Sequence, residues 1–205
     1  MKNLLLSVAV AGAVLAAAVK AAETTDRLAP SPRVLVFAKL APRLTPEAAT
    51  RESEARSVIE DWPRSSRKVA EVMLEKYGEP DEAAEAALIW RDRAPWKKIV
   101  VHRASWGSRI FDGGDDVLQQ FISYRVPLGK FDELAAFDRR IVADRTNNEL
   151  SARSDSERWN FLAINLAREI IIGWKTPEEA YTTYRLVRRL AASGKSSPYT
   201  EGLDF

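Results

Sequence analysis

The chain has 205 residues, with 31 Lys and Arg against 29 Asp and Glu, a single histidine and no cysteine. Without cysteine, the chain has no disulfide, no cysteine nucleophile and no cysteine for a lipid at a cleavage site. One histidine without cysteine also excludes an intramolecular zinc site of the Cys/His kind. We expect no metal site and no cofactor.

The first residues predict an export signal. Lys2 precedes an apolar run of 16 residues, Leu4–Val19, and Val19 and Ala21 precede Ala22 at a plausible cleavage site. The run is shorter than the roughly 20 residues of a spanning helix, and no twin arginine precedes it. We therefore predict a Sec-type signal peptide over 1–21 and a periplasmic or secreted protein. An uncleaved anchor is the alternative.

Removal of this leader changes the charge balance. Lys2 and Lys20 belong to it and no acid does, so 29 basic and 29 acidic side chains remain. Such a balance gives no global attraction to nucleic acid or anionic lipid. We expect no nucleic-acid partner, and no stable membrane span after signal cleavage.

The next segments begin with an arm and two helices. Residues 22–44 contain three prolines and little periodicity, which predicts a flexible or extended arm. Thr45-Pro46-Glu47 resembles a helix start, and this helix continues towards Trp62. A second helix covers Ser65–Lys76, and Gly78 is placed to cap it. One face of it is expected to be apolar: Val69, Val72, Met73 and Tyr77.

Short elements follow. Ala86–Arg91 and Trp96–Arg103 are typical of two strands around the turn RDRAP. We interpret 115–124 and 130–137 as short helices. Residues 141–145 and 150–153 then form a second hairpin around Thr-Asn-Asn-Glu, where Asn tolerates a positive φ.

The last two helices have the clearest signals. Ser156–Gly173 carries an apolar stripe and ends at glycine. Thr176-Pro177-Glu178-Glu179 predicts a capping box that opens a helix to Ala192. Residues 193–205 are expected to be a disordered tail. The inward-facing positions of the two helices are Trp159, Leu162, Ala163, Leu166, Ile170, Ala180, Tyr184, Val187 and Ala191.

This order of elements indicates an α+β fold. We predict a single helix-rich domain over 45–192, with a small antiparallel sheet built from two β-hairpins. The arm and the tail flank it.

Two groups of residue types raise questions of chemistry. His102 is the only base for a Ser-His-Asp triad, but it lies in a strand pattern and no Gly-x-Ser-x-Gly elbow is present. We interpret it as a partly buried strand residue. Asp112, Asp115 and Asp116 lack the spacing of a calcium loop, and we interpret them as acids at a helix start.

The tip of the first hairpin is the candidate binding site. Cations and aromatic rings alternate there, a combination that holds glycans, phosphates or protein partners. The alternative is structural, with tryptophans in the core and turn charges that keep a sheet edge soluble. We favour the core for Trp90 and leave the others open. The candidate binding residues are Arg91, Arg93, Trp96, Lys97 and Lys98.

Several blocks resemble a family of uncharacterised bacterial exported proteins. They are EKYGEPDE, LIW, APWKKIVVHR, QQFISYRVP, KFDELAAFD, DRTNNELSARSDSE and NFLAINLAREI, and the likeness spans Val58–Ala180. It implies one intact domain and export, and it implies no reaction. The chain departs from the pattern at Ala94, where the family has glycine, and in ASWGSRIFDGGDD.

From these observations we expect a non-catalytic binding or interaction module of the cell envelope. Its partner is another envelope protein or a cell-wall component. The alternative is a hydrolase of envelope glycans, which needs two carboxyl groups facing each other across a cleft.

Overall fold

The computed structural model describes residues 54–105 and 115–205. The signal peptide, the arm, the start of the first helix and Asp112 lie outside the described residues. Residues 54–60 are helical, in agreement with the predicted helix that runs towards Trp62.

The described residues form an α+β fold, which confirms the predicted class. Six strands of this part make one antiparallel sheet in the order β1-β2-β3-β4-β6-β5. The two predicted hairpins are its β2–β3 and β5–β6 pairs. The strands are β1 (Glu82–Ala84), β2 (Ala87–Arg93), β3 (Trp96–His102), β4 (Leu118–Ser123), β5 (Val142–Asp144) and β6 (Glu149–Ser154).

The prediction of a helix over 115–124 is wrong, because β4 occupies that place. This strand joins the hairpins, pairing with β3 on one side and β6 on the other. Four of its six side chains are buried: Leu118, Gln119, Gln120 and Ile122. Because neighbouring side chains point to opposite faces of a sheet, β4 has buried side chains on both faces. A central strand covered in this way loses the alternation of apolar and polar residues by which strands are recognised.

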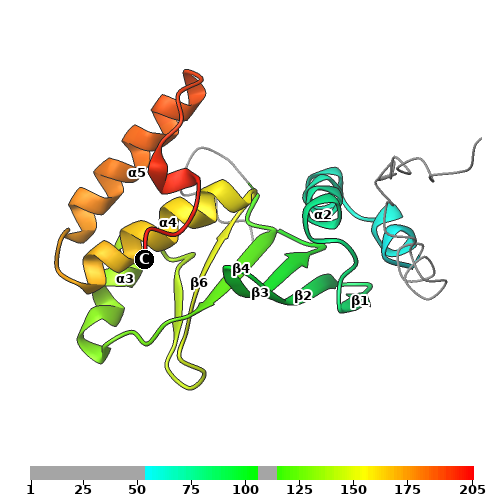
Figure 1. Ribbon diagram of the computed structural model, residues 1–205, viewed down its shortest axis with the longest axis horizontal. Coiled ribbons are helices and arrows are strands. Elements are labelled where there is room, and N and C mark those ends of the chain that lie inside the picture. Colours follow the sequence, from blue (N-terminus) through cyan, green and yellow to red (C-terminus); the bar gives the residue numbers. More distant parts are fainter. Residues whose placement is uncertain (1–53, 106–114) are drawn as a thin grey trace, which may run out of the picture. The chain divides into compact units, whose positions relative to one another are not determined.

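Helices cover one side of the sheet (Figure 1). α2 contacts β2 and β3, whereas α4 contacts β4 and β6. α5 packs on α4, and α3 contacts both α4 and α5. These helices are α2 (Arg64–Tyr77), α3 (Phe131–Phe137), α4 (Glu157–Ile171) and α5 (Pro177–Ala192), with short 3₁₀ turns η1 (Leu128–Lys130) and η2 (Pro198–Thr200).

The predicted caps at Gly78, Gly173 and Thr176 are confirmed, whereas Thr45-Pro46-Glu47 lies outside the described residues. Thr176 and Glu179 form a reciprocal capping box at the start of α5. Gly78 and Gly173 have φ angles of 72° and 79°, which suit glycine at helix ends. The apolar stripe of α4 is buried as expected. In α2, however, Val72 is 48% exposed, so that helix buries a narrower face than its periodicity predicts.

The prediction of a disordered tail is wrong for the C-terminal residues. The Asn165 side-chain amide of α4 donates to the carbonyls of Tyr199 (3.3 Å) and Gly202 (2.8 Å), and its oxygen accepts from the Asp204 amide. The Tyr199 hydroxyl donates to Glu169 at 2.8 Å. One buried asparagine thus binds the backbone of this segment, and Tyr199 and Leu203 pack against the core.

Candidate functional site

The cations of the predicted binding tip are each paired with a nearby acid. Arg91 forms an ion pair with Glu82, on the neighbouring strand β1. Lys97 lies 2.8 Å from Glu149 at the start of β6. Arg93 pairs with Asp81 at 3.4 Å, and Lys98 reaches Glu149 at 3.8 Å. The arginines therefore extend towards β1 and the lysines towards β6, so the structure does not bring the four cations together.

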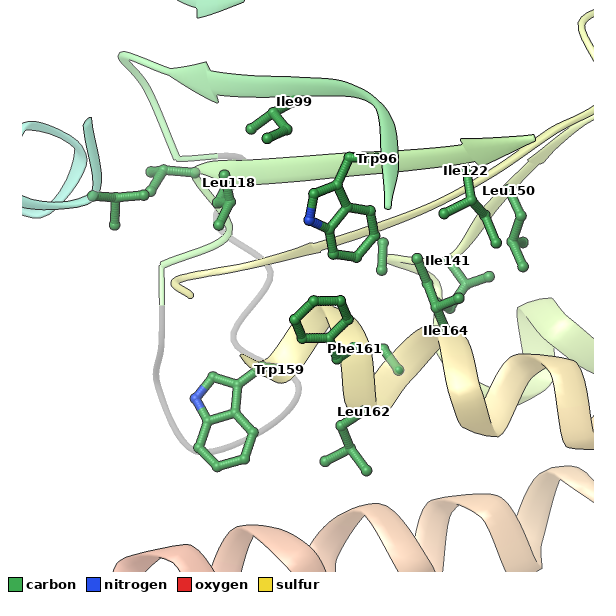
Figure 2. Packing of buried hydrophobic residues seen from close by; sticks show 14 of the residues in the cluster. Trp96, Ile99, Leu118, Ile122, Ile141, Leu150, Trp159, Phe161, Leu162 and Ile164 are labelled. Carbon is green, nitrogen blue, oxygen red and sulfur yellow. The ribbon is translucent and has the colours of Figure 1, made fainter. Parts of the chain in front are cut away.

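Trp96, the aromatic residue of this tip, is buried. Its side chain is 1% exposed, and its ring stacks on Phe161 of α4 with centroids 4.8 Å apart (Figure 2). The indole Nε1 donates to Oε1 of Glu157 at 2.6 Å. Trp90 is fully buried as well, and its Nε1 donates to the Gly78 carbonyl at 2.9 Å. The Pro95-Trp96 step thus turns the ring into the core rather than towards a ligand.

The hydrogen bond from Trp96 leads to a buried carboxylate that sequence reasoning missed. Glu157 begins α4, is 9% exposed and accepts hydrogen bonds from four side chains. Oε1 accepts from the Tyr77 hydroxyl, the Trp96 indole and the Gln120 amide, and Oε2 accepts from Lys76. α2, β3, β4 and α4 therefore meet at one side chain.

These donors decide the ionisation of Glu157. Burial alone favours the neutral carboxyl, but hydrogen bonds from Lys76, Tyr77 and Trp96 outweigh it and lower the pKa of Glu157. Burial and the adjacent carboxylate raise the pKa of Tyr77. Glu157 is thus an ionised acceptor at neutral pH, and Tyr77 is a neutral donor.

A cleft opens next to this carboxylate, between α2 and the first turn of α4. Its volume is about 620 Å³. Apolar side chains of α2 form one wall: Val69, Val72 and Met73. Trp159 lies in the other wall, where the guanidinium carbons of Arg158 and Arg188 each sit 4.2 Å from its ring centroid.

Charges of both signs surround the apolar walls of the cleft. Lys68, Lys76 and Arg158 supply three positive charges to the lining, and Asp115, Asp155 and Glu157 supply three negative ones. The cleft is therefore apolar with a rim that carries no net charge. None of the five residues predicted as the binding site lines the cleft. Val72 is the most exposed apolar side chain of its lining, at 48%.

The other sequence candidates have structural roles. His102 is half-buried in β3, as expected, beside Gln119 at 3.4 Å. Burial, followed by the charge of Arg153, lowers its pKa. Asp116 is buried and accepts from the Ser105 hydroxyl at 2.8 Å. It precedes a strand, so our interpretation of it as an acid at a helix start is wrong.

The described residues hold neither a metal-binding cluster nor a membrane-spanning helix. No cluster of three or more His, Asp or Glu in residues 54–105 and 115–205 is arranged to hold a metal ion. Within the same ranges, no helix combines the length and hydrophobicity that a membrane crossing requires.

Comparisons with protein-family models, with curated proteins and with solved structures give no match.

Proposed function

We propose that the protein is an exported, non-catalytic binding module of the cell envelope, and that the cleft between α2 and α4 is its binding site. The cleft is the observation that carries this proposal. It joins apolar walls to a rim of mixed charge, and it has the size of pockets that hold ligands or anchoring side chains. The N-terminal sequence supports the export setting.

The chemistry of the cleft favours an apolar peptide segment of another envelope protein. Val72 is half-exposed on a helix whose Val69, Met73 and Leu74 are buried, so a partner side chain gains apolar contact there. A rim of equal positive and negative charges suits a peptide, whose own backbone and side chains present donors and acceptors. It offers no excess charge for a strongly ionic ligand.

The hydrolase alternative is less well supported. Three carboxylates line the cleft, and such an enzyme needs two carboxyl groups that face each other. Glu157, however, is ionised and its oxygens are occupied by four donors, so it has no proton to give to a leaving group. Release of soluble fragments from purified cell wall by the wild type, and its loss in Asp155→Asn, would favour the hydrolase over the binding module.

Site-specific photo-crosslinking in intact cells tests the binding proposal. A photoreactive residue at position 72 faces the cleft, and one at position 71 is turned by about 100° around the same helix. We expect one dominant envelope protein to be captured from position 72 and none from position 71. Equal capture from both positions, or none from position 72 at normal export, would overturn the proposal.

A second variant separates the cleft from the rest of the α2 surface. With the photoreactive residue at position 68, also in the lining, Val72→Asp places a charge on the apolar wall. We expect capture to fall about tenfold, because the partner's apolar side chain then meets an unpaired carboxylate. Unchanged capture would locate the contact outside the cleft.

A further inference from the structure

A second concave site lies where the chain leaves β4, away from the α2–α4 cleft. Its volume is about 640 Å³. Two loops form it: residues 124–128, which follow β4, and the β5–β6 turn. The lining consists of Arg125, Val126, Pro127, Leu128, Asp144, Arg145 and Asn148. It shares no residue with the cleft assigned to the proposed function.

Strand pairing explains why these two loops meet. β4 and β6 are antiparallel neighbours, with Ser123 opposite Glu149. The residues just after β4 must therefore lie beside those just before β6. A backbone hydrogen bond of 2.9 Å from the Tyr124 amide to the Asn148 carbonyl continues the ladder past the strand ends. The loop that carries Arg125 is thus tied to the turn that carries Arg145.

Both walls of this site are held in place. In the turn, the Asp144 carboxylate accepts from the amides of Thr146 (2.8 Å) and Asn147 (3.0 Å) and from the Asn147 side chain (2.8 Å). Asn148 adopts a φ of 50°, which asparagine tolerates. On the other wall, Val126 is buried. Binding of a ligand here would therefore cost little conformational entropy, because the loops are already ordered.

The two arginines have no carboxylate partner among the described residues. Asp144 is the only acid in the lining, and its oxygens accept the hydrogen bonds of its own turn. Glu149, next along the chain, is paired with Lys97 and Lys98. The site thus has two guanidinium groups against one carboxylate, which leaves a local excess of positive charge.

We propose that this site binds a phosphate group. A guanidinium presents a planar fork of donors that matches phosphate oxygens, and two such groups on fixed loops supply both charge and geometry. Asp144 opposes the anion, but its oxygens are directed to the turn amides. Leu128, which is 62% exposed at the rim, would contact whatever carries the phosphate. That carrier is either a free phosphorylated compound or the headgroup of an anionic lipid.

Titration with inorganic phosphate, followed by NMR of the protein, tests the proposal. Ionic strength is kept constant with chloride, so that general screening does not change. We expect saturable shifts at the amides and guanidinium groups of Arg125 and Arg145. In Arg125→Gln/Arg145→Gln, affinity should fall about tenfold or more, since charge-assisted hydrogen bonds are lost. Arg189→Gln, which removes one positive charge from an exposed position of α5, should leave the affinity unchanged.

A vesicle arm distinguishes the two carriers. Flotation is measured with phosphatidylcholine vesicles and with vesicles containing about one-third phosphatidylglycerol, a fraction that gives a negative surface potential. Saturable phosphate shifts without flotation assign a free phosphorylated compound. Flotation with phosphatidylglycerol alone that is lost in the double variant assigns a lipid headgroup. Absence of both, or equal losses in Arg189→Gln, overturns the proposal, whatever the result of crosslinking at position 72.

Discussion

The tip of the β2–β3 hairpin and the buried end of α4 use charge in opposite ways. At the tip, Arg91 and Arg93 each pair with their own acid and the two lysines share Glu149. The side chains of Arg91 and Glu82 are 49% and 53% exposed. At the start of α4, one carboxylate collects donors from α2, β3 and β4. Exposed pairs contribute about 0–1 kcal/mol each, whereas breaking a buried cluster costs several kcal/mol. The dense run of charges in the sequence therefore belongs to the hairpin tip, the region that contributes less to stability.

The sharpest way to break the buried region is Trp96→Ala. We expect the free energy of unfolding to fall by about 4 kcal/mol, because a cavity replaces the ring stacked on Phe161 and the bond to Glu157 is lost. Urea denaturation followed by circular dichroism measures the change. Trp174→Ala is the matched control, since Trp174 is 69% exposed. A loss below about 1 kcal/mol at position 96 would mean that the tip does not use this tryptophan as an anchor.

Glu157→Ala removes the shared acceptor itself. We expect a loss of about 3 kcal/mol in the free energy of unfolding, since the Trp96 and Gln120 donors are left buried without a partner. The charge of Lys76 reaches water and adds less, because its side chain is 50% exposed. Glu82→Ala, which breaks an exposed pair, should change the same quantity by about 0.5 kcal/mol or less. Equal effects of the two substitutions would erase the contrast between the regions.

The pH dependence of stability sharpens the comparison. The pKa of Glu157 is lowered in the folded protein from its ordinary value of 4.5, so the unfolded chain takes up the proton first as pH falls. The contribution of the carboxylate is therefore complete above pH 4.5 and is lost as pH falls through the folded pKa. We expect the stability difference between the wild type and Glu157→Gln to narrow in acid. A constant difference down to about pH 3 would show that the carboxylate is not held ionised.

The smallest effects belong to the tip charges. Arg91→Ala and Lys97→Ala should each change the free energy of unfolding by about 0.5 kcal/mol or less at physiological salt. Their partners, Glu82 and Glu149, can be measured in double-mutant cycles with them. A coupling energy above about 1.5 kcal/mol in either cycle would place that pair among buried rather than surface interactions.

Local signals made α4 and α5 predictable. Thr176 and Glu179 specify a helix start by themselves, and Gly173 specifies a helix end, so no distant residue is needed to recognise them. β4 could not be recognised in this way. It is a strand because it pairs with β3 and β6 on either side. It is buried, but its two glutamines are polar residues that do not predict burial.

The candidate site was harder to predict than the fold. Glu157 in the sequence SDSERW has the appearance of an ordinary acid in a first helical turn, and its donors come from positions up to 81 residues away. The C-terminal segment is similar, because Asn165 of α4 binds its backbone, and Tyr199 and Leu203 pack against the core. The role of such residues depends on partners that are distant in the sequence, so no local sequence pattern predicts it.

The central place of β4 has a consequence for how the chain folds. The β2–β3 and β5–β6 pairs close short turns, and hairpins of this kind form within about 1–10 μs. β4 must pair across larger separations, for example Gln120 with Ala152, and only then do the two hairpins become one sheet. Closing those loops carries the entropic cost of folding, so changes in β4 should slow folding, whereas changes in the outer strands β1 and β5 should mainly speed unfolding.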